Sequence, residues 1–260
     1  MNLENKNILI TRSKEQAQEF AQLIKKYGAN PVFFPTIEIK EPESWNELDN
    51  LLNSLNNFDG VIFTSQNAIK YFFIRLNYQQ ISNSVLENKL TFVIGEKSKI
   101  EIEKHNLKCT AIPESYTAEE LAHLIKKYNI KGKNFLFPRG NLSREIIIDN
   151  LRTFGAEVTP VVVYQTICPE PQNIDDVKQK LLRRTIDVVT FTSPSTANNF
   201  FKIISDQNIK ASIKELTKIA VIGVTTAKAL EKNGITPHII AEPSTLEGLL
   251  ESIKKYFEVN

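Results

Sequence analysis

Two short stretches rich in hydroxyl groups contain the residues whose types and spacing could do chemistry. Thr192-Ser193-Pro194-Ser195 follows an apolar run that ends at Phe191, and Thr64-Ser65-Gln66-Asn67 follows a similar run that ends at Phe63. The two stretches are related by an offset of 128 in the numbering (192 minus 64). An apolar strand that leads into Thr-Ser and then a helix places hydroxyls and backbone N–H groups at one strand end. Such groups can bind carboxylates or phosphates.

The same donor-rich composition recurs where the other apolar runs end, and it includes two arginines, Arg12 and Arg139. Taken singly, each Ser, Thr or Asn is better explained as a helix N-cap, and Ser13 with Gln16 forms a capping-box pattern. Each arginine could be solvated or could bind an anion. The hypothesis of an anion site therefore depends on the whole set. The candidate binding residues are Thr11, Arg12, Ser13, Thr64, Ser65, Asn67, Gly95, Arg139, Gly140, Thr192, Ser193, Ser195, Gly223, Thr225 and Thr226.

Tyr164 lies in the middle of an extended segment, between apolar Val163 and polar Gln165. Its phenol could pack as a structural residue, or its hydroxyl could act as a weak acid toward a ligand. Position alone favours the structural role. Asp59 and Asp187 begin their strands and are expected to cap the preceding turns.

Several familiar sites are missing from the sequence. No G-x-G-x-x-G or G-x-x-x-x-G-K-[ST] follows a strand, and there is no G-x-S-x-G elbow. The histidines and cysteines show no metal-ligand spacing. We therefore expect no metal site, and dinucleotide sites, P-loop nucleotide sites and hydrolase serines are disfavoured.

The composition is that of an ordinary globular protein. The 260 residues are 42% hydrophobic and 24% charged, and the net charge of +2 gives no overall field toward nucleic acid or a membrane. The first residues show no apolar targeting core, and no apolar run approaches the length of a membrane span. We expect a cytoplasmic protein with neither nucleic acid nor membrane as a partner.

The elements that must position these residues occur twice. Lys133–Arg139 matches Lys6–Arg12 at an offset of 127 (133 minus 6), and Lys218–Gly223 matches Leu90–Gly95 at 128 (223 minus 95). Strand and helix patterns alternate with short loops in both copies. This order predicts an α/β protein built from two doubly wound parallel sheets.

Each copy also contains an extended, partly polar ribbon, at residues 33–42 and 161–169. Two such connectors suggest a pair of strands that links two lobes. In one arrangement the first strand–helix unit, to about Phe34, completes the lobe formed by the C-terminal part, and about 40–165 form the other lobe. In the alternative, two consecutive lobes meet near residue 130. Periodicity does not choose between them.

Seven further motifs occur along the chain. F-T-S-P-S-x-x-x-x-F stands at Phe191–Phe200, A-V-I-G-x-T-T-A at Ala220–Ala227, F-P-R-G at Phe137–Gly140, F-G-A-x-V at Phe154–Val158 and V-Y-x-T at Val163–Thr166. I-T-R stands at Ile10–Arg12 and F-T-S-x-N-A at Phe63–Ala68. Taken together, these motifs resemble those of uroporphyrinogen-III synthases over the whole chain and in the same order.

The resemblance implies two flavodoxin-like lobes joined by a two-stranded β-ladder, which is the discontinuous arrangement. The segments 1–35 and 170–260 would form the first lobe, the segment 40–162 would form the second, and the segments 35–40 and 162–170 would form the ladder linker. The Thr192-Ser193 stretch would then face Thr64-Ser65 across one cleft, with Tyr164 on the ladder between them.

The resemblance also implies an activity: linear hydroxymethylbilane is closed to uroporphyrinogen III, with loss of water and inversion of ring D, without a cofactor. Tyr164 matches the residue that assists departure of the hydroxyl. Gln66 and Val224 depart from the family pattern. The residues that match positions holding the acid side chains of the substrate are Thr192, Ser193, Ser195, Thr225 and Thr226.

The expected partner is hydroxymethylbilane, with a transient contact to hydroxymethylbilane synthase, and the expected state is a monomer. Two other classes of function compete with this interpretation. A non-catalytic two-lobed module could sense or carry an anionic small molecule, and a two-lobed sugar-transfer enzyme would bind nucleotide sugars.

Overall fold

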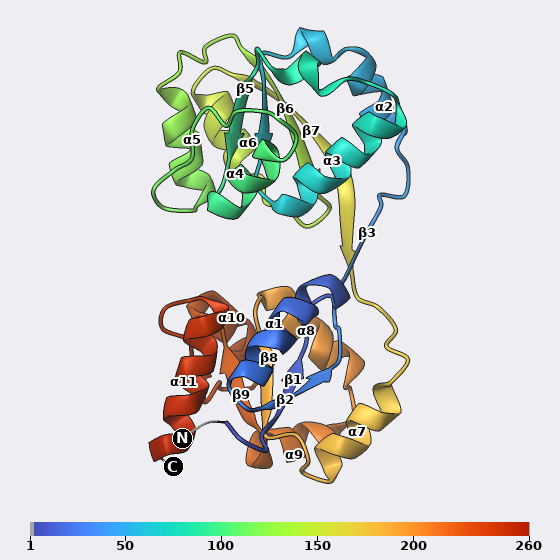
Figure 1. Ribbon diagram of the computed structural model, residues 1–260, viewed down its shortest axis with the longest axis vertical. Coiled ribbons are helices and arrows are strands. Elements are labelled where there is room, and N and C mark those ends of the chain that lie inside the picture. The colour runs from blue at the N-terminus through green and yellow to red at the C-terminus, as the bar shows by residue number, and fades with distance from the viewer. Residues whose placement is uncertain (1–2, 260) are drawn as a thin grey trace. The chain divides into compact units, whose positions relative to one another are not determined.

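The computed structural model describes residues 3–259, which divide into two compact units. Unit 1 comprises the residues up to Glu38 and those from Ile167 onward, and unit 2 comprises Ile39–Thr166. Each unit is a predominantly parallel sheet with helices on both faces (Figure 1). The chain therefore leaves unit 1 after one strand–helix–strand passage, builds unit 2, and returns to complete unit 1.

The sheet of unit 1 has the strand order β10-β9-β8-β1-β2, and each pair of neighbouring strands is parallel. Its strands are β1 (Asn7–Ile10), β2 (Asn30–Phe33), β8 (Val188–Phe191), β9 (Lys218–Val221) and β10 (Ile239–Ile240). Its helices are α1 (Lys14–Lys26), α7 (Ile174–Leu182), α8 (Pro194–Ile203), α9 (Gln207–Leu216), α10 (Val224–Lys232) and α11 (Leu246–Val259).

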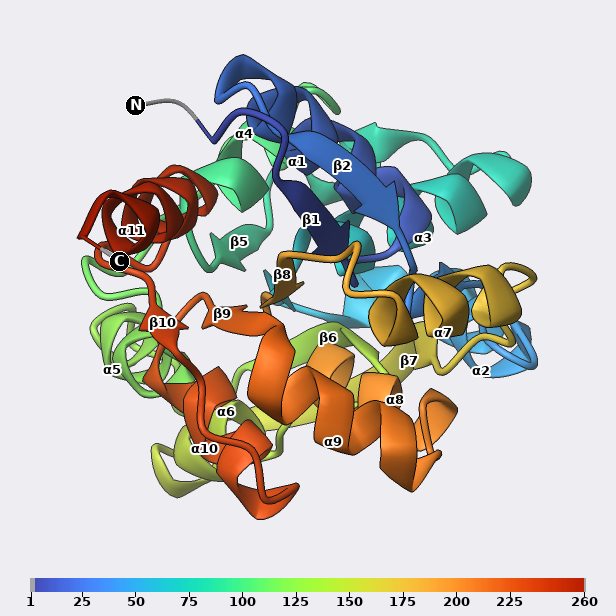
Figure 2. The ribbon, with the colours of Figure 1, turned by 90° about the horizontal axis from the view of Figure 1, so that it is seen from below.

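Both faces of this sheet are buried, because successive side chains of a strand point to opposite faces. Leu9 belongs to the hydrophobic cluster under α7, α8, α9 and α10, whereas Ile8 and Ile10 belong to the cluster under α1 and α11. Figure 2 shows these two sets of helices on either side of the unit 1 strands. The apolar runs of the sequence are thus strands that are buried on both faces. The polar residues that follow them lie together at the carboxyl ends of the strands.

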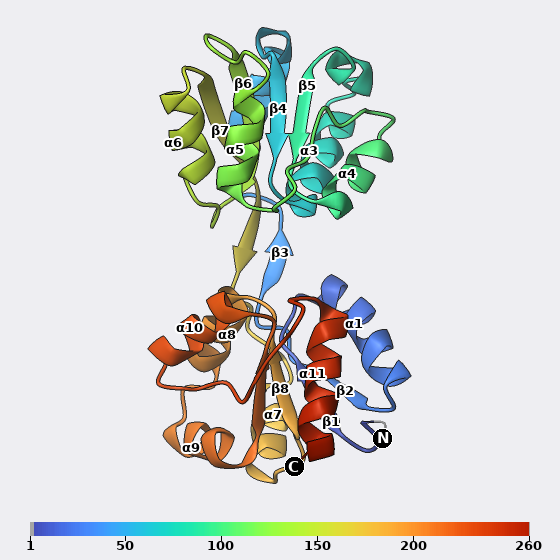
Figure 3. The same ribbon diagram turned by 90° about the vertical axis from the view of Figure 1, so that its left-hand side faces the viewer.

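The sheet of unit 2 has the order β3-β7-β6-β4-β5, and the labels of β7, β6, β4 and β5 follow that order across the unit in Figure 3. Its strands are β3 (Glu38–Lys40), β4 (Gly60–Phe63), β5 (Leu90–Val93), β6 (Asn134–Gly140) and β7 (Glu157–Ile167). Its helices are α2 (Asn46–Asn53), α3 (Gln66–Tyr78), α4 (Glu96–Glu103), α5 (Ala118–Lys126) and α6 (Ile146–Thr153), with 3-10 turns η1 (Leu55–Asn57) and η2 (Asn83–Leu86).

The sheet of unit 2 is also covered on both faces, with Phe63 in the cluster under α2, α3 and α4 and Ile62 in the cluster under α5 and α6. Strand β7 runs without interruption from Glu157 to Ile167, and β3 borders it at the edge of the sheet. The parallel α/β fold predicted from the alternating pattern is confirmed. Among the described residues, no helix combines the length and the apolar character needed to cross a membrane.

An aspartate at the start of one strand in each unit ties that strand to its neighbour. Asp59 accepts a hydrogen bond from the backbone N–H of Asn134 at 2.8 Å and lies 3.4 Å from the Lys133 ammonium. Asp187 accepts the N–H of Asn7 at 2.8 Å, with the Lys6 ammonium at 3.1 Å. The expectation that both aspartates cap the preceding turn was wrong, because their carboxylates point across to the adjacent strand.

Replacing Asp59 with asparagine is expected to reduce stability at neutral pH and to have less effect in acid. The hydrogen bond from Asn134, followed by the contact with Lys133, holds the pKa of Asp59 below its usual range. A depressed folded-state pKa stabilises the protein above the unfolded value, about 3.9, and this stabilisation is lost as the pH falls through the folded value. Urea unfolding at pH 7, 5, 4 and 3 measures the difference, with Asp175→Asn at an exposed position as the control.

Candidate functional site

The predicted binding residues gather at the carboxyl ends of adjacent strands in each unit. In unit 1 they follow β9, β8 and β1, which are neighbours in the sheet, and we call these strand ends the unit-1 edge. In unit 2 they follow or end β6, β4 and β5, and Tyr164 of β7 lies opposite Gly140, the last residue of β6; we call this place the unit-2 edge. The unit-1 edge contains Thr11, Arg12, Ser13, Thr192, Ser193, Ser195, Gly223, Thr225 and Thr226, and the unit-2 edge contains Thr64, Ser65, Asn67, Gly95, Arg139, Gly140 and Tyr164.

Two of the predicted serines are helix caps in equivalent places. The Ser65 side chain accepts the N–H of Ala68 at 3.1 Å, which fixes its hydroxyl over the start of α3. The Ser193 side chain accepts the N–H of Thr196 at 3.2 Å, and the Thr196 hydroxyl accepts the Ser193 N–H, which completes a capping box. The N-cap prediction is confirmed for both, and neither role removes the hydroxyl from the edge, because both serines remain partly exposed.

Ser13 precedes α1 but makes no side-chain capping bond, so the predicted capping box with Gln16 is wrong. Gln16 instead accepts a bond from Arg12 at 3.2 Å, which draws it away from the helix terminus. Ser13 itself is almost completely buried.

Thr11 lies inside unit 1 rather than on its surface. It has no exposed surface, and its hydroxyl donates to the carbonyl of Thr190 at 2.7 Å. The hydroxyl of Thr36, also completely buried, donates to the carbonyls of Thr11 and Thr196 at 3.1 and 3.0 Å. Thr11 was expected to contact the ligand. Its hydroxyl instead points into the sheet and bonds to the neighbouring strand, so its role at the unit-1 edge is structural.

Arg12 and Arg139 occupy equivalent positions, at an offset of 127 (139 minus 12), but have different surroundings. Nη1 of Arg139 pairs with Glu145 and Nη2 donates to the Ser143 carbonyl, so this guanidinium holds its own loop together. Arg12 is partly buried, and its guanidinium donates to the neutral Gln16. Burial lowers the pKa of Arg12, opposed by the charge of Glu19. Its Nε, like that of Arg139, is buried without an acceptor among the described residues.

An arginine stays protonated at any physiological pH. The guanidinium of Arg12 therefore offers the unit-1 edge a positive charge that a ligand carboxylate could meet.

Two glycines stand at helix N-termini on these edges. Gly95, before α4, has a φ of 82°, which favours glycine, and a Cβ added there would lie 3.7 Å from the ring of Tyr116. Gly223 precedes α10 in an extended conformation.

Thr225 is exposed in the first turn of α10, whereas Thr226 is buried beside it. Thr64, Asn67, Thr192 and Ser195 are each partly exposed around these helix starts.

Tyr164 brings a phenol hydroxyl to the unit-2 edge. It is 9% exposed, and its Oη lies 3.2 Å from the Ser65 Oγ, so either hydroxyl can donate to the other. Its register partner on β6 is Gly140, and a Cβ added at Gly140 would lie only 2.5 Å from the Cζ of Tyr164. Gly140 was expected to bind the ligand; the structure shows that it is buried and that it makes the space for the tyrosine ring.

The sequence reasoning missed Tyr71, whose ring stacks on Tyr164 with centroids 6.1 Å apart and planes 18° from parallel. It also missed Thr36 and Asn199, which meet in unit 1, where Asn199 donates to the Thr36 carbonyl at 2.8 Å. A signal for Tyr71 and Asn199 was present in the repeat, because the offset of 128 relates these two residues (199 minus 71).

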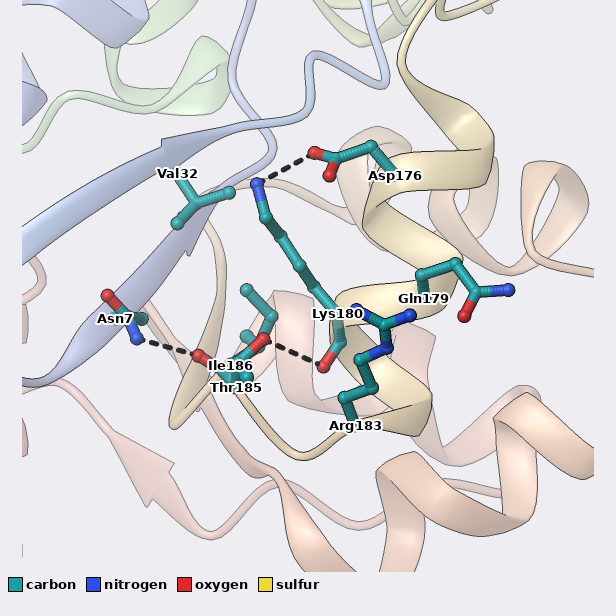
Figure 4. Close-up of a pocket in the computed structure, with 8 residues that line it drawn as sticks. All are labelled: Asn7, Val32, Asp176, Gln179, Lys180, Arg183, Thr185 and Ile186. Carbon is teal, nitrogen blue, oxygen red and sulfur yellow. Dashed lines mark hydrogen bonds and ion pairs between the residues drawn. The ribbon is translucent and has the colours of Figure 1, made fainter.

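A pocket of about 380 Å³ in unit 1 lies away from these edges (Figure 4). Asn7, at the start of β1, and Ile186, just before β8, line it, so it belongs to the opposite end of the strands. Several of its polar groups pair with one another: Lys180 pairs with Asp176 at 2.7 Å, and Asn7 donates to the Thr185 carbonyl at 2.8 Å. None of the predicted binding residues lines this pocket.

Titratable side chains do not assemble a metal centre within residues 3–259, since no three histidine, cysteine, aspartate or glutamate side chains come together in a way that could hold an ion. The groups that the two edges offer to a ligand are hydroxyls, helix N-termini, one partly buried guanidinium that donates to a neutral amide, and one phenol. Such an arrangement can bind several carboxylates and can offer one weakly acidic proton.

Comparisons with known proteins agree over nearly the whole chain. The family model described as uroporphyrinogen-III synthase HemD matches residues 18–251. The uroporphyrinogen-III synthase of Chlorobaculum parvum is 35% identical over 256 residues, covering 96% of this chain and 100% of that protein. That of Synechococcus elongatus is 31% identical over 258 residues, covering 98% and 96%.

Solved structures share the fold. A mutant uroporphyrinogen III synthase of Thermus thermophilus aligns with a TM-score of 0.69 and 16% identity, over 98% of this chain and 100% of that one. The uroporphyrinogen-III synthetase of Helicobacter pylori aligns with a TM-score of 0.61 and 19% identity, also over 98% and 100%. At these identities the structural similarity establishes the two-unit fold.

Proposed function

The chain belongs to the uroporphyrinogen-III synthase family, and we propose that it closes linear hydroxymethylbilane to uroporphyrinogen III with inversion of ring D. The enzyme is a cyclising lyase of tetrapyrrole biosynthesis. The family assignment rests on a match to residues 18–251 and on relatives at 35% and 31% identity over nearly the full length of both chains. The structural observation that supports the reaction is the phenol of Tyr164, held beside Ser65 at an edge rich in anion-binding groups.

The many carboxylates of the substrate require donors rather than a high net charge. We propose that the strand ends of both units supply them: the hydroxyls of Ser65, Ser193 and Thr225, and the N-terminal N–H groups of α3, α8 and α10. Helix N-termini carry partial positive charge and favour bound carboxylates. The segments 35–40 and 162–170 would serve as the two-stranded linker between the lobes, 1–35 with 170–260 and 40–162.

Tyr164 assists departure of the hydroxyl group. The C–O bond of the hydroxymethyl carbon breaks, the electron pair leaves with the oxygen, and the Tyr164 proton completes a water molecule. The phenolate oxygen that remains can accept a hydrogen bond from Ser65, which is already within 3.2 Å. The proton is restored when the attacking pyrrole ring loses its own proton after ring closure.

The selectivity comes from how the substrate is held. Once the hydroxyl has left, the azafulvene-type cation would close spontaneously to the symmetrical isomer I. Binding the carboxylates at fixed points brings the substituted carbon of the last ring to the cation first, and the spirocyclic intermediate follows. Little further acid–base chemistry is required, so the edges need donors more than general bases.

The rate of hydroxymethylbilane consumption tests this proposal. The purified protein should consume the substrate well above the spontaneous rate, in proportion to protein concentration and with saturation. A module that only binds the anionic ligand would leave the consumption rate unchanged or slow it. A sugar-transfer enzyme would instead bind UDP-sugars. We expect calorimetric titration of this protein with UDP-sugars to give no heat.

Replacing Arg12 with glutamine is expected to raise the KM for hydroxymethylbilane about tenfold, because a charge-assisted hydrogen bond contributes about 1.5 kcal/mol. The guanidinium meets a substrate carboxylate throughout the reaction, so kcat should change little. Steady-state kinetics measure both constants. Arg183→Gln, an exposed residue at the opposite end of the unit 1 strands, is the matched control. An unchanged KM for Arg12→Gln would make Arg12 a structural residue.

We also propose a cytoplasmic, monomeric enzyme that receives hydroxymethylbilane from hydroxymethylbilane synthase through a transient contact. The chemistry of the substrate supports such a contact, since free hydroxymethylbilane closes by itself to isomer I. Sedimentation at micromolar concentration should give the mass of one chain. In a coupled assay at low enzyme concentration, an excess of the slow variant Tyr164→Phe should increase the share of isomer I if transfer is direct.

A further inference from the structure

The ring of Tyr164 is held on two sides within unit 2. On one side the absence of a side chain at Gly140 lets the phenol approach the β6 backbone, since an added Cβ would lie 2.5 Å from Cζ and 2.7 Å from Oη. The ring of Tyr71 lies stacked against Tyr164, 18° from parallel. Rotation of the Tyr164 ring toward either side would require Tyr71 or strand β6 to move.

Tyr71 is itself anchored. Its hydroxyl donates to the carbonyl of Ile39 in β3 at 3.3 Å, and its backbone belongs to α3, the helix that Ser65 caps. The same helix therefore contacts Tyr164 twice, at the hydroxyl through Ser65 and at the ring through Tyr71. Both the position of the phenol oxygen and the plane of its ring are set by one rigid element.

Unit 1 has a related contact from the corresponding helix position. By the repeat offset of 128, Asn199 on α8 corresponds to Tyr71 (199 minus 71). Asn199 donates to the carbonyl of Thr36, which is completely buried and follows β2, the strand that lies beside β1 as β7 lies beside β6. The Thr36 hydroxyl donates to backbone carbonyls. In unit 2 the residue contacted from this helix position, Tyr164, carries a hydroxyl that lies at the edge beside Ser65.

We propose that Tyr71 is a positioning residue for the reaction: it holds the phenol of Tyr164 against Ser65, in the orientation from which the proton reaches the leaving hydroxyl. This inference rests on the proposed function, in which Tyr164 donates that proton. Tyr71 acts through Tyr164 and contributes no reacting atom. Its loss should therefore matter only while Tyr164 has a hydroxyl to position.

The test is a double-mutant cycle in kcat, with hydroxymethylbilane as substrate. Tyr71→Leu should lower kcat about tenfold, since a reacting group displaced by about an ångström can lose up to a hundredfold, and KM should stay near the wild-type value. In a Tyr164→Phe background the same substitution should change kcat less than twofold. Tyr71→Phe, which keeps the stacked ring and loses the hydroxyl that bonds to Ile39, should retain most of the activity.

Tyr78→Leu is the matched control, because Tyr78 lies two turns further along α3 and is 72% exposed. Thermal unfolding of every variant separates loss of fold from loss of rate. Equal losses from Tyr71→Leu in both backgrounds, or a loss no greater than that of Tyr78→Leu, would overturn the inference.

The outcomes separate this inference from the proposed function. A wild-type protein that does not consume hydroxymethylbilane would overturn the function itself. A wild-type protein that consumes it, with Tyr164→Phe impaired and Tyr71→Leu fully active, would overturn only the role of Tyr71.

Discussion

Replacing Tyr164 with phenylalanine is expected to lower kcat for hydroxymethylbilane about tenfold to a hundredfold. A positioned proton donor typically contributes about a hundredfold or more to the rate, so the expected loss is at the low end of that range or below it. The substitution removes one oxygen atom and leaves the ring between Gly140 and Tyr71. KM should stay near the wild-type value, because the carboxylates of the substrate are bound by other residues. Rapid-quench measurement of substrate consumption gives the rate.

The cost to stability should be small, since the lost hydrogen bond to Ser65 is worth about 1 kcal/mol. Tyr27→Phe is a suitable control: it removes another bound tyrosine hydroxyl, which donates to Glu251 at 2.7 Å in unit 1. That variant should show wild-type kcat. If Tyr164→Phe also turned over at the wild-type rate, Tyr164 would be a packing residue and the departure of the hydroxyl would need no phenol.

Replacing Gly140 with alanine is expected to reduce both stability and kcat. The new methyl group would lie 2.5 Å from the Tyr164 ring, so the ring or strand β6 must move. Overpacking of this kind typically costs about 1–3 kcal/mol. Displacement of the ring would also separate the phenol from Ser65, so kcat should fall at least to the level of Tyr164→Phe.

Urea unfolding in two backgrounds identifies the cause. In a Tyr164→Leu background, Gly140→Ala should destabilise the protein much less than in the wild type, because the branched side chain no longer fills the space beside the glycine. Equal destabilisation in both backgrounds would place the clash elsewhere in the sheet. An unaffected Gly140→Ala enzyme would show that the ring does not depend on this glycine.

The features that are local in sequence could be predicted from it. The duplicated strand–Thr-Ser–helix pattern correctly indicated parallel sheets, and Ser65 and Ser193 cap their helices as expected. A cap depends on residues three positions apart, so its signal lies within one turn of the chain. The placement of candidate residues at strand ends follows in the same way, because every apolar run ends in polar residues at the same edge.

Features that depend on the neighbouring strand could not be read from the sequence. Thr11 is buried because Thr190 offers it a carbonyl across the β1–β8 pair, and no pattern around Thr11 contains that partner. Gly140 lies beside Tyr164 through the register of β6 on β7, which shifts between Arg139 and Gly140. Arg139 was expected to resemble Arg12, but Glu145 in its own loop pairs with it.

Comparing the two copies shows where one fold has diverged in chemistry. Asn199 and Tyr71 occupy corresponding helix positions, but Asn199 contacts Thr36 whereas Tyr71 contacts Tyr164, whose ionisable hydroxyl lies at the unit-2 edge. In the first pair, the Thr36 hydroxyl and the Asn199 amide both donate to backbone carbonyls. The duplicated fold thus supplies anion-binding strand ends twice, whereas the candidate proton donor belongs to unit 2 alone.

The central claim is that the protein directs ring closure toward the inverted isomer. Its most direct test is the isomer composition of the product from a single turnover, with enzyme in excess over hydroxymethylbilane, oxidised to uroporphyrins and separated chromatographically. Uroporphyrin III should dominate with the enzyme, and uroporphyrin I should dominate in an enzyme-free reaction run in parallel. A product composed of isomer I alone in the presence of the folded protein would contradict the assignment.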